Sequence, residues 1–151
     1  MRTVHLGSGV SYEDGLKHQD ATVDALLDGS GEETLFLLEH APVYTIGRLR
    51  DQSSLRDTTM LPAPVVETNR GGQATYHGPG QLVGYPVLWV PGKRGGGMAD
   101  TVAYVRSVEQ LVIDALGDLG LPDVGRLPDY PGVWVEPTSD QPRKIAAIGV
   151  R

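Results

Sequence analysis

One short stretch combines side chains that could do chemistry with an unusual density of glycine. Residues Arg70–Gln81 read RGGQATYHGPGQ and include four glycines, one proline and one of the four histidines of the chain. Glycine loses more backbone freedom on folding than any other residue, so this run indicates either a flexible linker or a site where a ligand approaches the backbone closely. Because Thr75-Tyr76-His77 favours extended structure, we interpret the stretch as a site between two strands rather than a linker. A glycine-rich hairpin with a surface histidine is the alternative.

The spacing of these residues does not match the common catalytic or nucleotide-binding loops. No Gly-Lys-Ser/Thr follows the glycines, as it would in a P-loop, and Gly78–Gly84 does not fit the Gly-x-Gly-x-x-Gly pattern. The Gly-x-Ser-x-Gly turn of many hydrolases is also missing from the sequence. No metal-binding spacing is found among His5, His18, His40 and His77, and we therefore predict no metal site.

Lys144 is the second candidate for chemistry. The chain has three lysines, of which Lys17 lies on a predicted helix and Lys93 in a predicted loop, whereas Lys144 opens an apolar strand. Partial desolvation would lower the pKa of its amine, which could then act as an acid, a base or a positive charge beside an anion. The alternative is a lysine at a strand end whose ammonium reaches solvent.

Composition narrows the classes of protein to which the chain can belong. Its 151 residues suffice for one domain with a single core, and the net charge of -6 disfavours a nucleic-acid surface. No cysteine is present, so the chain contains no disulfide, thiolate metal site or cysteine nucleophile. Neither a signal peptide nor a membrane-spanning apolar run is visible, and we predict a cytoplasmic protein without a membrane or nucleic-acid partner.

The elements that must position these residues follow from the apolar pattern. Ser11 is the predicted cap of a helix over Tyr12–Leu27, and Asp100 or Thr101 that of a helix ending near Leu119. The helical stripes that would face the core are Tyr12, Leu16, Val23 and Leu27 in the first helix and Val102, Val105, Val112, Leu116 and Leu119 in the second. The predicted strands are Thr3–Leu6, Thr34–Leu38, Val43–Ile46, Val65–Thr68, Leu82–Val90, Val133–Val135 and Ile145–Val150.

Other segments are predicted to interrupt these elements. We expect a break at Glu39–Pro42 and loops at Arg48–Pro64 and Pro91–Gly97. Pro86 indicates that its strand is either at a sheet edge or irregular. The order of elements does not alternate regularly, which favours an α+β fold with a mixed β-sheet flanked by helices, in one domain spanning residues 1–151. Lys144–Arg151 ends on an apolar, strand-like run, from which we expect that the native protein continues.

Four segments together resemble the octanoyltransferases of lipoate synthesis, also called lipoyl(octanoyl) transferases. They are Leu37–Arg48, Arg70–Gln81, Pro131–Val135 and Arg143–Arg151, and their order and spacing extend the resemblance over essentially the whole chain. The resemblance implies a fold like the catalytic domain of biotin and lipoate protein ligases. It also implies transfer of an octanoyl group from octanoyl-acyl carrier protein to a lysine of a lipoyl domain, such as those of 2-oxoacid dehydrogenases and glycine cleavage proteins, without ATP, metal or another cofactor.

The resemblance also implies roles for individual residues. The octanoyl pocket would be lined by Arg70, Gly71, Gly72, Gln73, Ala74, Thr75, Tyr76 and His77, with Ala147, Ile148 and Gly149 forming another wall. Lys144 matches the family lysine that lowers the pKa of a nucleophilic cysteine. Small residues such as Gly71 and Ala147 would leave room for an acyl chain, whose burial yields roughly 0.8 kcal/mol per methylene.

Because of one departure from the family pattern, resemblance to the family does not by itself imply the family's activity. The family's cysteine lies in a Pro-Cys-Gly-like turn beyond the segments matched here, whereas these 151 residues contain no cysteine. We therefore expect either the N-terminal part of a transferase or a non-catalytic protein that binds or regulates through an acyl group. An ATP-dependent ligase is disfavoured because the glycine-rich loop differs from those of the ligases.

Overall fold

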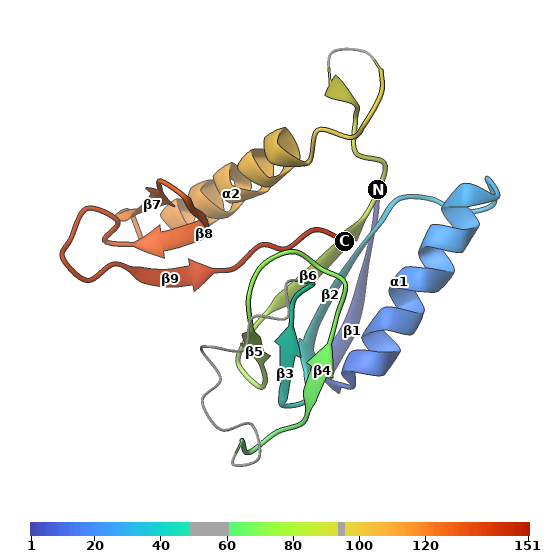
Figure 1. Cartoon of the computed structure of the whole chain (residues 1–151), viewed down its shortest axis with the longest axis horizontal. Coiled ribbons are helices and arrows are strands. Elements are labelled where there is room, and N and C mark those ends of the chain that lie inside the picture. The colour runs from blue at the N-terminus through green and yellow to red at the C-terminus, as the bar shows by residue number, and fades with distance from the viewer. Residues whose placement is uncertain (49–60, 94–95) are drawn as a thin grey trace. The chain divides into compact units, whose positions relative to one another are not determined.

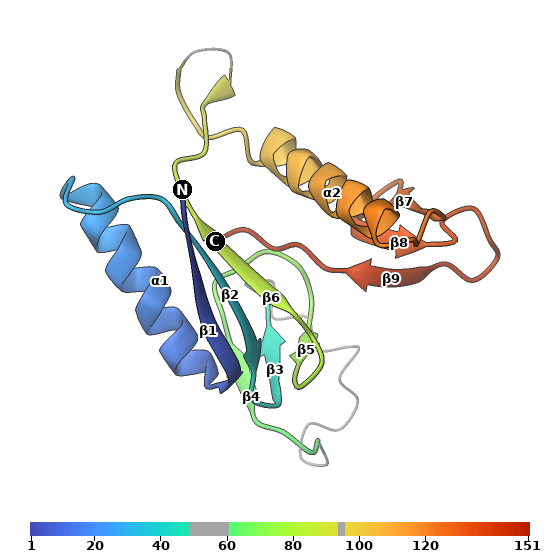
Figure 2. The ribbon, with the colours of Figure 1, turned by 180° about the vertical axis from the view of Figure 1, so that it is seen from behind.

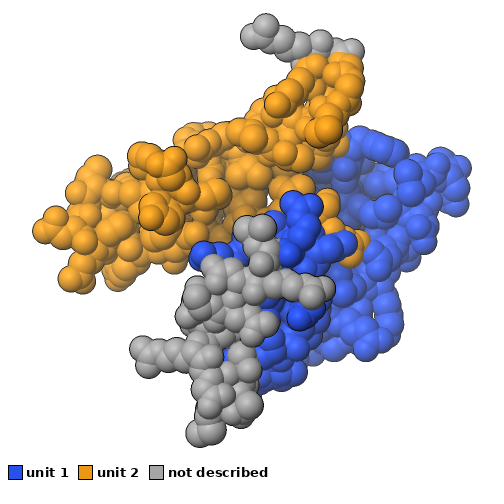
Figure 3. All heavy atoms as spheres, viewed as in Figure 1, with its two compact units in different colours: residues 1–89 blue, residues 90–151 orange. Residues whose placement is uncertain are grey.

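The computed structural model describes residues 1–48, 61–93 and 96–151, which form two compact units. One unit is Met1–Trp89 and the other is Val90–Arg151 (Figure 3). Most of the predicted loop at 48–64 and two residues of the loop at 91–97 lie outside the described residues. In the part that is described, no helix is long and apolar enough to cross a membrane.

The first unit begins with a parallel strand–helix–strand arrangement. Strand β1 (Arg2–Val10) pairs in parallel with β2 (Thr34–His40), and helix α1 (Tyr12–Leu27) connects them. Strand β6 (Val83–Val87) pairs antiparallel with the other side of β2, which gives a mixed sheet of order β1-β2-β6 (Figure 1). As predicted, Pro86 lies on an edge strand, where its missing N–H is tolerated.

Helix α1 has the predicted cap and bounds, but its buried face differs from the prediction. The Ser11 hydroxyl accepts a hydrogen bond from the Asp14 N–H at 3.0 Å, and Gly29, with φ 75°, follows the last turn. Val23 and Leu27 are exposed, whereas Gly15 is the buried position of the helix. A Cβ at Gly15 would lie 2.9 Å from His40 Cε1, so a small residue is needed where the helix meets that ring.

Strand β2 forms the centre of this unit's core. Its side chains alternate in burial, and Phe36 and Leu38 pack with Val83 of β6. The alternation continues through His40, which is fully buried, so the break predicted at Glu39–Pro42 is wrong for its first two residues. The strand persists because His40 pairs with Val10 of β1 and its ring bonds to the Val10 carbonyl.

A second mixed sheet in the same unit carries the glycine-rich stretch. Strand β3 (Val43–Ile46) pairs in parallel with β4 (Val65–Glu67) and antiparallel with β5 (Thr75–His77), in the order β4-β3-β5. Tyr44 lies opposite Tyr76, with ring centroids 5.0 Å apart. The predicted strand character of Thr75–His77 is therefore confirmed, and a loop of seven residues, 68–74, joins β4 to β5.

The second unit packs one helix on an antiparallel sheet. Asp100 is the N-terminal cap of helix α2 (Thr101–Asp118), and its carboxylate accepts a hydrogen bond from the Ala103 N–H at 3.1 Å. The sheet has the order β7-β8-β9, with β7 at Val124–Leu127, β8 at Tyr130–Val135 and β9 at Arg143–Ala146 (Figure 2). Together, the two helices and the mixed sheets of the described residues confirm the predicted α+β class.

A buried carboxylate, rather than an apolar stripe, is central to the second unit. Val105, Val112 and Leu116 are half-buried as predicted, but Val102 and Leu119 are exposed. On the same face, the fully buried Glu109 takes hydrogen bonds from Arg106, Arg126 and the Gly132 N–H, each at 2.9 Å. Glu109 thereby ties α2 to both β7 and β8.

The last predicted strand ends earlier than expected. Strand β9 stops at Ala146, so the prediction that it extends to Val150 is wrong, and residues 147–149 follow the strand. The register pairs Val133 with Ala146, and the next position on β8 is Gly132. Its φ of 119° is not that of a strand, and its N–H is donated to Glu109, so pairing ends there.

Candidate functional site

The guanidinium of Arg70 organises the glycine-rich stretch. Its Nη1 donates to the carbonyls of Gly71 and Gln73 at 3.0 and 2.9 Å. Its Nη2 donates to the Thr45 carbonyl at 2.9 Å and to the Thr45 hydroxyl at 2.6 Å. Because its donors hold the backbone of the loop and the neighbouring strand β3, Arg70 shapes the loop from within.

Two glycines allow this loop to lie against β3. A Cβ at Gly47 would overlap the carbonyl oxygen of Gly72, and Gly72 itself has a φ of 86°, in the region that glycine adopts without strain. The Arg48 N–H also donates to the Arg70 carbonyl at 2.8 Å. The density of glycine noted in the sequence is thus explained here by close contact between two backbones.

Replacing Arg70 by lysine should loosen this loop. A lysine ammonium is a point charge and cannot bridge two Thr45 oxygens and two loop carbonyls at once. The loss of charged hydrogen bonds to the buried Thr45 should lower the unfolding free energy of the first unit by about 2 kcal/mol. Urea denaturation followed by Trp89 fluorescence in a Trp134→Phe background measures it.

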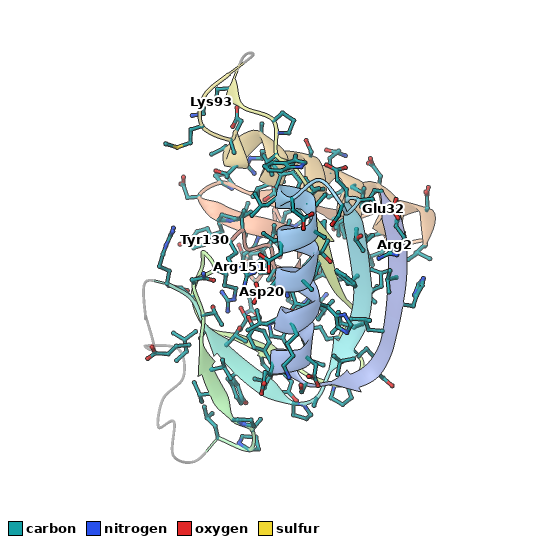
Figure 4. All side chains as sticks on the ribbon, turned by 90° about the vertical axis from the view of Figure 1, so that its right-hand side faces the viewer. Arg2, Asp20, Glu32, Lys93, Tyr130 and Arg151 are labelled. Carbon is teal, nitrogen blue, oxygen red and sulfur yellow. The ribbon has the colours of Figure 1, made fainter. Side chains whose placement is uncertain are left out.

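Arg2→Lys is the matched control for this substitution. Arg2 forms an exposed pair with Glu32 at 3.7 Å, and the two side chains lie side by side in Figure 4. Exposed pairs contribute about 0.5 kcal/mol, so the control should change stability little. Equal effects of the two substitutions would contradict the organising role of Arg70.

His77 ends strand β5 and lies within a network of polar groups. Its Nδ1 is 2.7 Å from the Gln81 side-chain oxygen, and its Nε2 is 3.4 Å from the Thr45 hydroxyl. Burial is the main cause that lowers the pKa of His77, and the neighbouring His40 and Arg70 add to it, although the hydrogen bond that the ring donates to Gln81 opposes them. The ring is therefore neutral at pH 7.

His40 and Tyr85 form the adjoining part of the cluster. His40 Nδ1 lies 2.9 Å from the Val10 carbonyl, and its Nε2 lies 2.7 Å from the Tyr85 hydroxyl. Burial lowers the pKa of His40 as well. The rings of His40 and His77 are 5.7 Å apart, and that of Tyr12 stacks on His77 at 6.5 Å. Side chains from α1, β2, β5 and β6 thus meet around two neutral imidazoles.

Residues 71–76 of the glycine-rich stretch are exposed or half-buried. Gly72 and Gln73 are exposed, and Gly71, Ala74 and Thr75 are half-buried. Tyr76 is exposed and lies on the opposite side of its strand from His77, against Tyr44. Their predicted contact with an acyl chain stays a prediction.

Lys144 lies in the second unit, on β9 opposite Trp134 of β8. Its Nζ is 4.7 Å from the centroid of the Trp134 ring, and partial desolvation lowers the pKa of the amine although the residue is exposed overall. Ile148 is half-buried, and Ala147 and Gly149 are exposed. The catalytic role of Lys144 and the wall formed by these three residues remain predictions.

Three residues of the candidate site, His40, Thr45 and Tyr85, were not predicted from the sequence. Their signal lay in strand alternation: His40 continues the buried face of Thr34, Phe36 and Leu38, and Thr45 is fully buried in β3. Polar side chains at such positions need partners, which is the feature that marks them. Among the described residues, no three His, Asp or Glu side chains gather closely enough to hold a metal ion.

Comparison with known proteins identifies the family to which the chain is related. Residues 11–151 match the lipoyl protein ligase A/B catalytic domain. Octanoyltransferases of Mycobacterium leprae and Leifsonia xyli are 44% and 45% identical to the chain over 94% and 96% of its length, which is 58% and 61% of theirs. That of Myxococcus xanthus is 43% identical over 98% of the chain and 42% of its own length. The chain thus spans roughly half the length of these curated relatives.

A solved structure supports the fold. A protein of T. acidophilum, solved with bound lipoic acid, superposes with a TM-score of 0.52 at 20% identity, over 85% of this chain and 52% of that one. At this identity the likeness concerns the fold alone. The family match over 11–151 is direct, and the chain belongs to the lipoyl protein ligase A/B catalytic domain family.

Proposed function

We propose that this chain carries the acyl-binding part of an octanoyltransferase, which moves an octanoyl group to a lysine of a lipoyl domain. The observation that carries the proposal is the 43–45% identity to curated octanoyltransferases over nearly the whole chain. The arrangement of Arg70, Gly47 and Gly72 supports it, because it holds a glycine-rich backbone in one defined conformation. Such a backbone could present N–H donors to the oxyanion of acyl transfer.

The finer parts of the proposal concern the route and the partners. The donor would be octanoyl-acyl carrier protein, and the acceptors the lipoyl domains of 2-oxoacid dehydrogenases and glycine cleavage proteins, in the cytoplasm. An acyl-cysteine route needs a thiol that these 151 residues do not contain. The proposal therefore assigns the chain acyl binding through residues 70–77 and 147–149, with Lys144 as the group that favours the thiolate.

Binding of an octanoyl thioester tests the acyl-binding part directly. Titration of the chain with octanoyl-pantetheine should give saturable shifts in the NMR signals of the glycine-rich stretch, and acetyl-pantetheine should bind more weakly. Each methylene buried contributes roughly 0.8 kcal/mol, so removing six of them should weaken binding by more than a hundredfold. A folded sample with no saturable binding would overturn the proposal.

The absence of cysteine from these residues favours one second candidate, a protein that binds an acyl group without transferring it. Both candidates predict octanoyl binding, so binding alone does not separate them. The coding sequence after the codon for Arg151 does: an in-frame Pro-Cys-Gly-like turn supports the transferase, and its absence supports the binding protein. Intact mass after incubation with octanoyl-acyl carrier protein should show no thioester adduct on the chain itself.

A further inference from the structure

The hydrogen bonds of Gln81 determine which nitrogen of His77 carries the proton. The Gln81 amide nitrogen donates to the Tyr76 carbonyl at 3.1 Å, which directs the amide oxygen toward His77 Nδ1 at 2.7 Å. An amide oxygen can only accept, so Nδ1 must be the protonated nitrogen. In the neutral ring, Nε2 then carries a lone pair.

The Nε2 atom of His77 is a base with only a weak existing partner. The Thr45 hydroxyl is 3.4 Å away, longer than a normal hydrogen bond from a hydroxyl, and the Thr75 carbonyl competes for its proton at the same distance. The other imidazole differs: His40 Nδ1–H donates to Val10, and its Nε2 accepts the Tyr85 hydroxyl at 2.7 Å. Of the two rings, His77 has the more available basic nitrogen.

The charges around His77 also favour the neutral, basic form. Arg70 is the cation of the cluster, and His40 would add a second positive charge if it were protonated. Tyr12 stacks on the ring, and Glu39 accepts the Gly80 N–H at 2.9 Å in the turn that follows His77. Burial, with smaller contributions from His40 and Arg70, lowers the pKa of His77, so the base is free at neutral pH.

We propose that His77 accepts the proton of the lysine amine that attacks the octanoyl thioester, and that Gln81 is the positioning residue that holds the required tautomer. The inference rests on the proposed function. The neutral amine nitrogen bonds to the thioester carbonyl carbon, and the carbonyl π electrons move to oxygen. The nitrogen then loses a proton to His77 Nε2, the oxygen electrons re-form the carbonyl as the C–S bond breaks with its electrons on sulfur, and the imidazolium returns the proton to the thiolate. The products are an amide and a thiol.

The tautomer is tested on the chain by 15N NMR of its histidines, with the exposed His5 and His18 as internal references. The wild type should show Nδ1 protonated and Nε2 unprotonated in His77. Gln81→Leu should shift His77 toward the Nε2–H form that a free side chain prefers, and Gln81→Glu should retain Nδ1–H because a carboxylate also accepts. Gln141→Leu, in an exposed loop, is the matched control and should change neither. An Nε2–H tautomer in the wild type would overturn the inference.

The proton transfer is tested by the rate at which this segment, joined to a cysteine nucleophile because its 151 residues contain none, converts octanoyl-pantetheine and a lipoyl domain to the octanoylated domain. His77→Gln should reduce the chain-dependent rate by about a hundredfold, Gln81→Leu should reduce it in the same direction, and Gln81→Glu should restore it. The advantage of the wild type over His77→Gln should diminish below pH 6.5, as His77 becomes protonated. Octanoyl binding with equal rates for wild type and His77→Gln would overturn this inference alone, whereas no octanoyl binding would overturn the proposed function.

Discussion

Replacing Glu109 by alanine is expected to destabilise the second unit by about 3 kcal/mol. The substitution removes a fully buried carboxylate on which Arg106, Arg126 and the Gly132 N–H converge. The two arginines are partly exposed and water can solvate them, but the Gly132 N–H is buried and would lose its partner. Urea denaturation followed by Trp134 fluorescence in a Trp89→Phe background measures the change.

Glu136→Ala is the control for this prediction. Glu136 also pairs with an arginine, Arg143 at 3.2 Å, but both side chains are largely exposed. Exposed pairs contribute about 0.5 kcal/mol, so this substitution should have a small effect. If the two glutamate variants were equally stable, Glu109 would not be the centre that joins α2 to β7 and β8.

The contribution of Glu109 should also depend on pH. Burial alone would raise its pKa, but the Gly132 N–H and the two arginines outweigh burial and hold the pKa below its ordinary value of 4.5. Stability from a carboxyl whose folded pKa is lowered is present above the unfolded pKa and is lost as the pH falls through the folded value. The difference between wild type and Glu109→Ala should therefore be full at pH 7 and smaller at pH 3.

Most helices and strands could be predicted from the sequence because caps and strand alternation involve residues that are close together along the chain. The Ser11 cap, the Asp100 cap and the alternation of β2 each depend on residues a few positions apart. Strand β7 was missed because Gly125 and Arg126 interrupt its apolar pattern, and its register is irregular between Gly125 and Leu127. Arg126 is held there by Glu109, a residue 17 positions earlier, which no local pattern reveals.

The strand in the glycine-rich stretch was predictable from the sequence, whereas the residues that surround it in the candidate site were not. The density of glycine predicted a ligand close to the backbone, which stays a prediction, whereas Gly47 and Gly72 show the close approach of two backbones. However, His40 was assigned to a break, because the Ala41-Pro42 sequence that follows it resembles the start of a turn. Its partners, Val10 and Tyr85, are 30 and 45 positions away, so the fold had to be known before the network could be assembled.

Lys144 should lose its proton at a lower pH than Lys17. The amine of Lys144 lies 4.7 Å from the Trp134 ring, and desolvation lowers its pKa. Lys17 is the opposite case, because the hydrogen bonds that it donates to the carboxylates of Glu13 and Asp14 raise its pKa. NMR titration of 13C-methylated lysines measures this order, and an equal or higher pKa for Lys144 would contradict the desolvation.

A lowered pKa matters for catalysis because it makes the Lys144 amine a better proton carrier near neutral pH. If Lys144 has the role proposed for it, Lys144→Ala should reduce octanoyl transfer by about a hundredfold, equivalent to a barrier increase of about 2.7 kcal/mol. The assay needs this segment joined to a cysteine nucleophile, because the 151 residues contain none. Lys93→Ala is the matched control and should retain the rate.

Lys144→Arg separates charge from proton transfer. Arginine keeps the positive charge and can still lie over the Trp134 ring, but it does not release its proton in the working pH range. If Lys144 acts only as a cation that favours a thiolate, the arginine variant should keep most of the activity. If it exchanges protons, the arginine variant should be as slow as Lys144→Ala, and the loss should persist across the pH profile because no pH in that range restores a titratable group. Wild-type rates in both variants would remove Lys144 from the reaction and leave it as a lysine packed on Trp134.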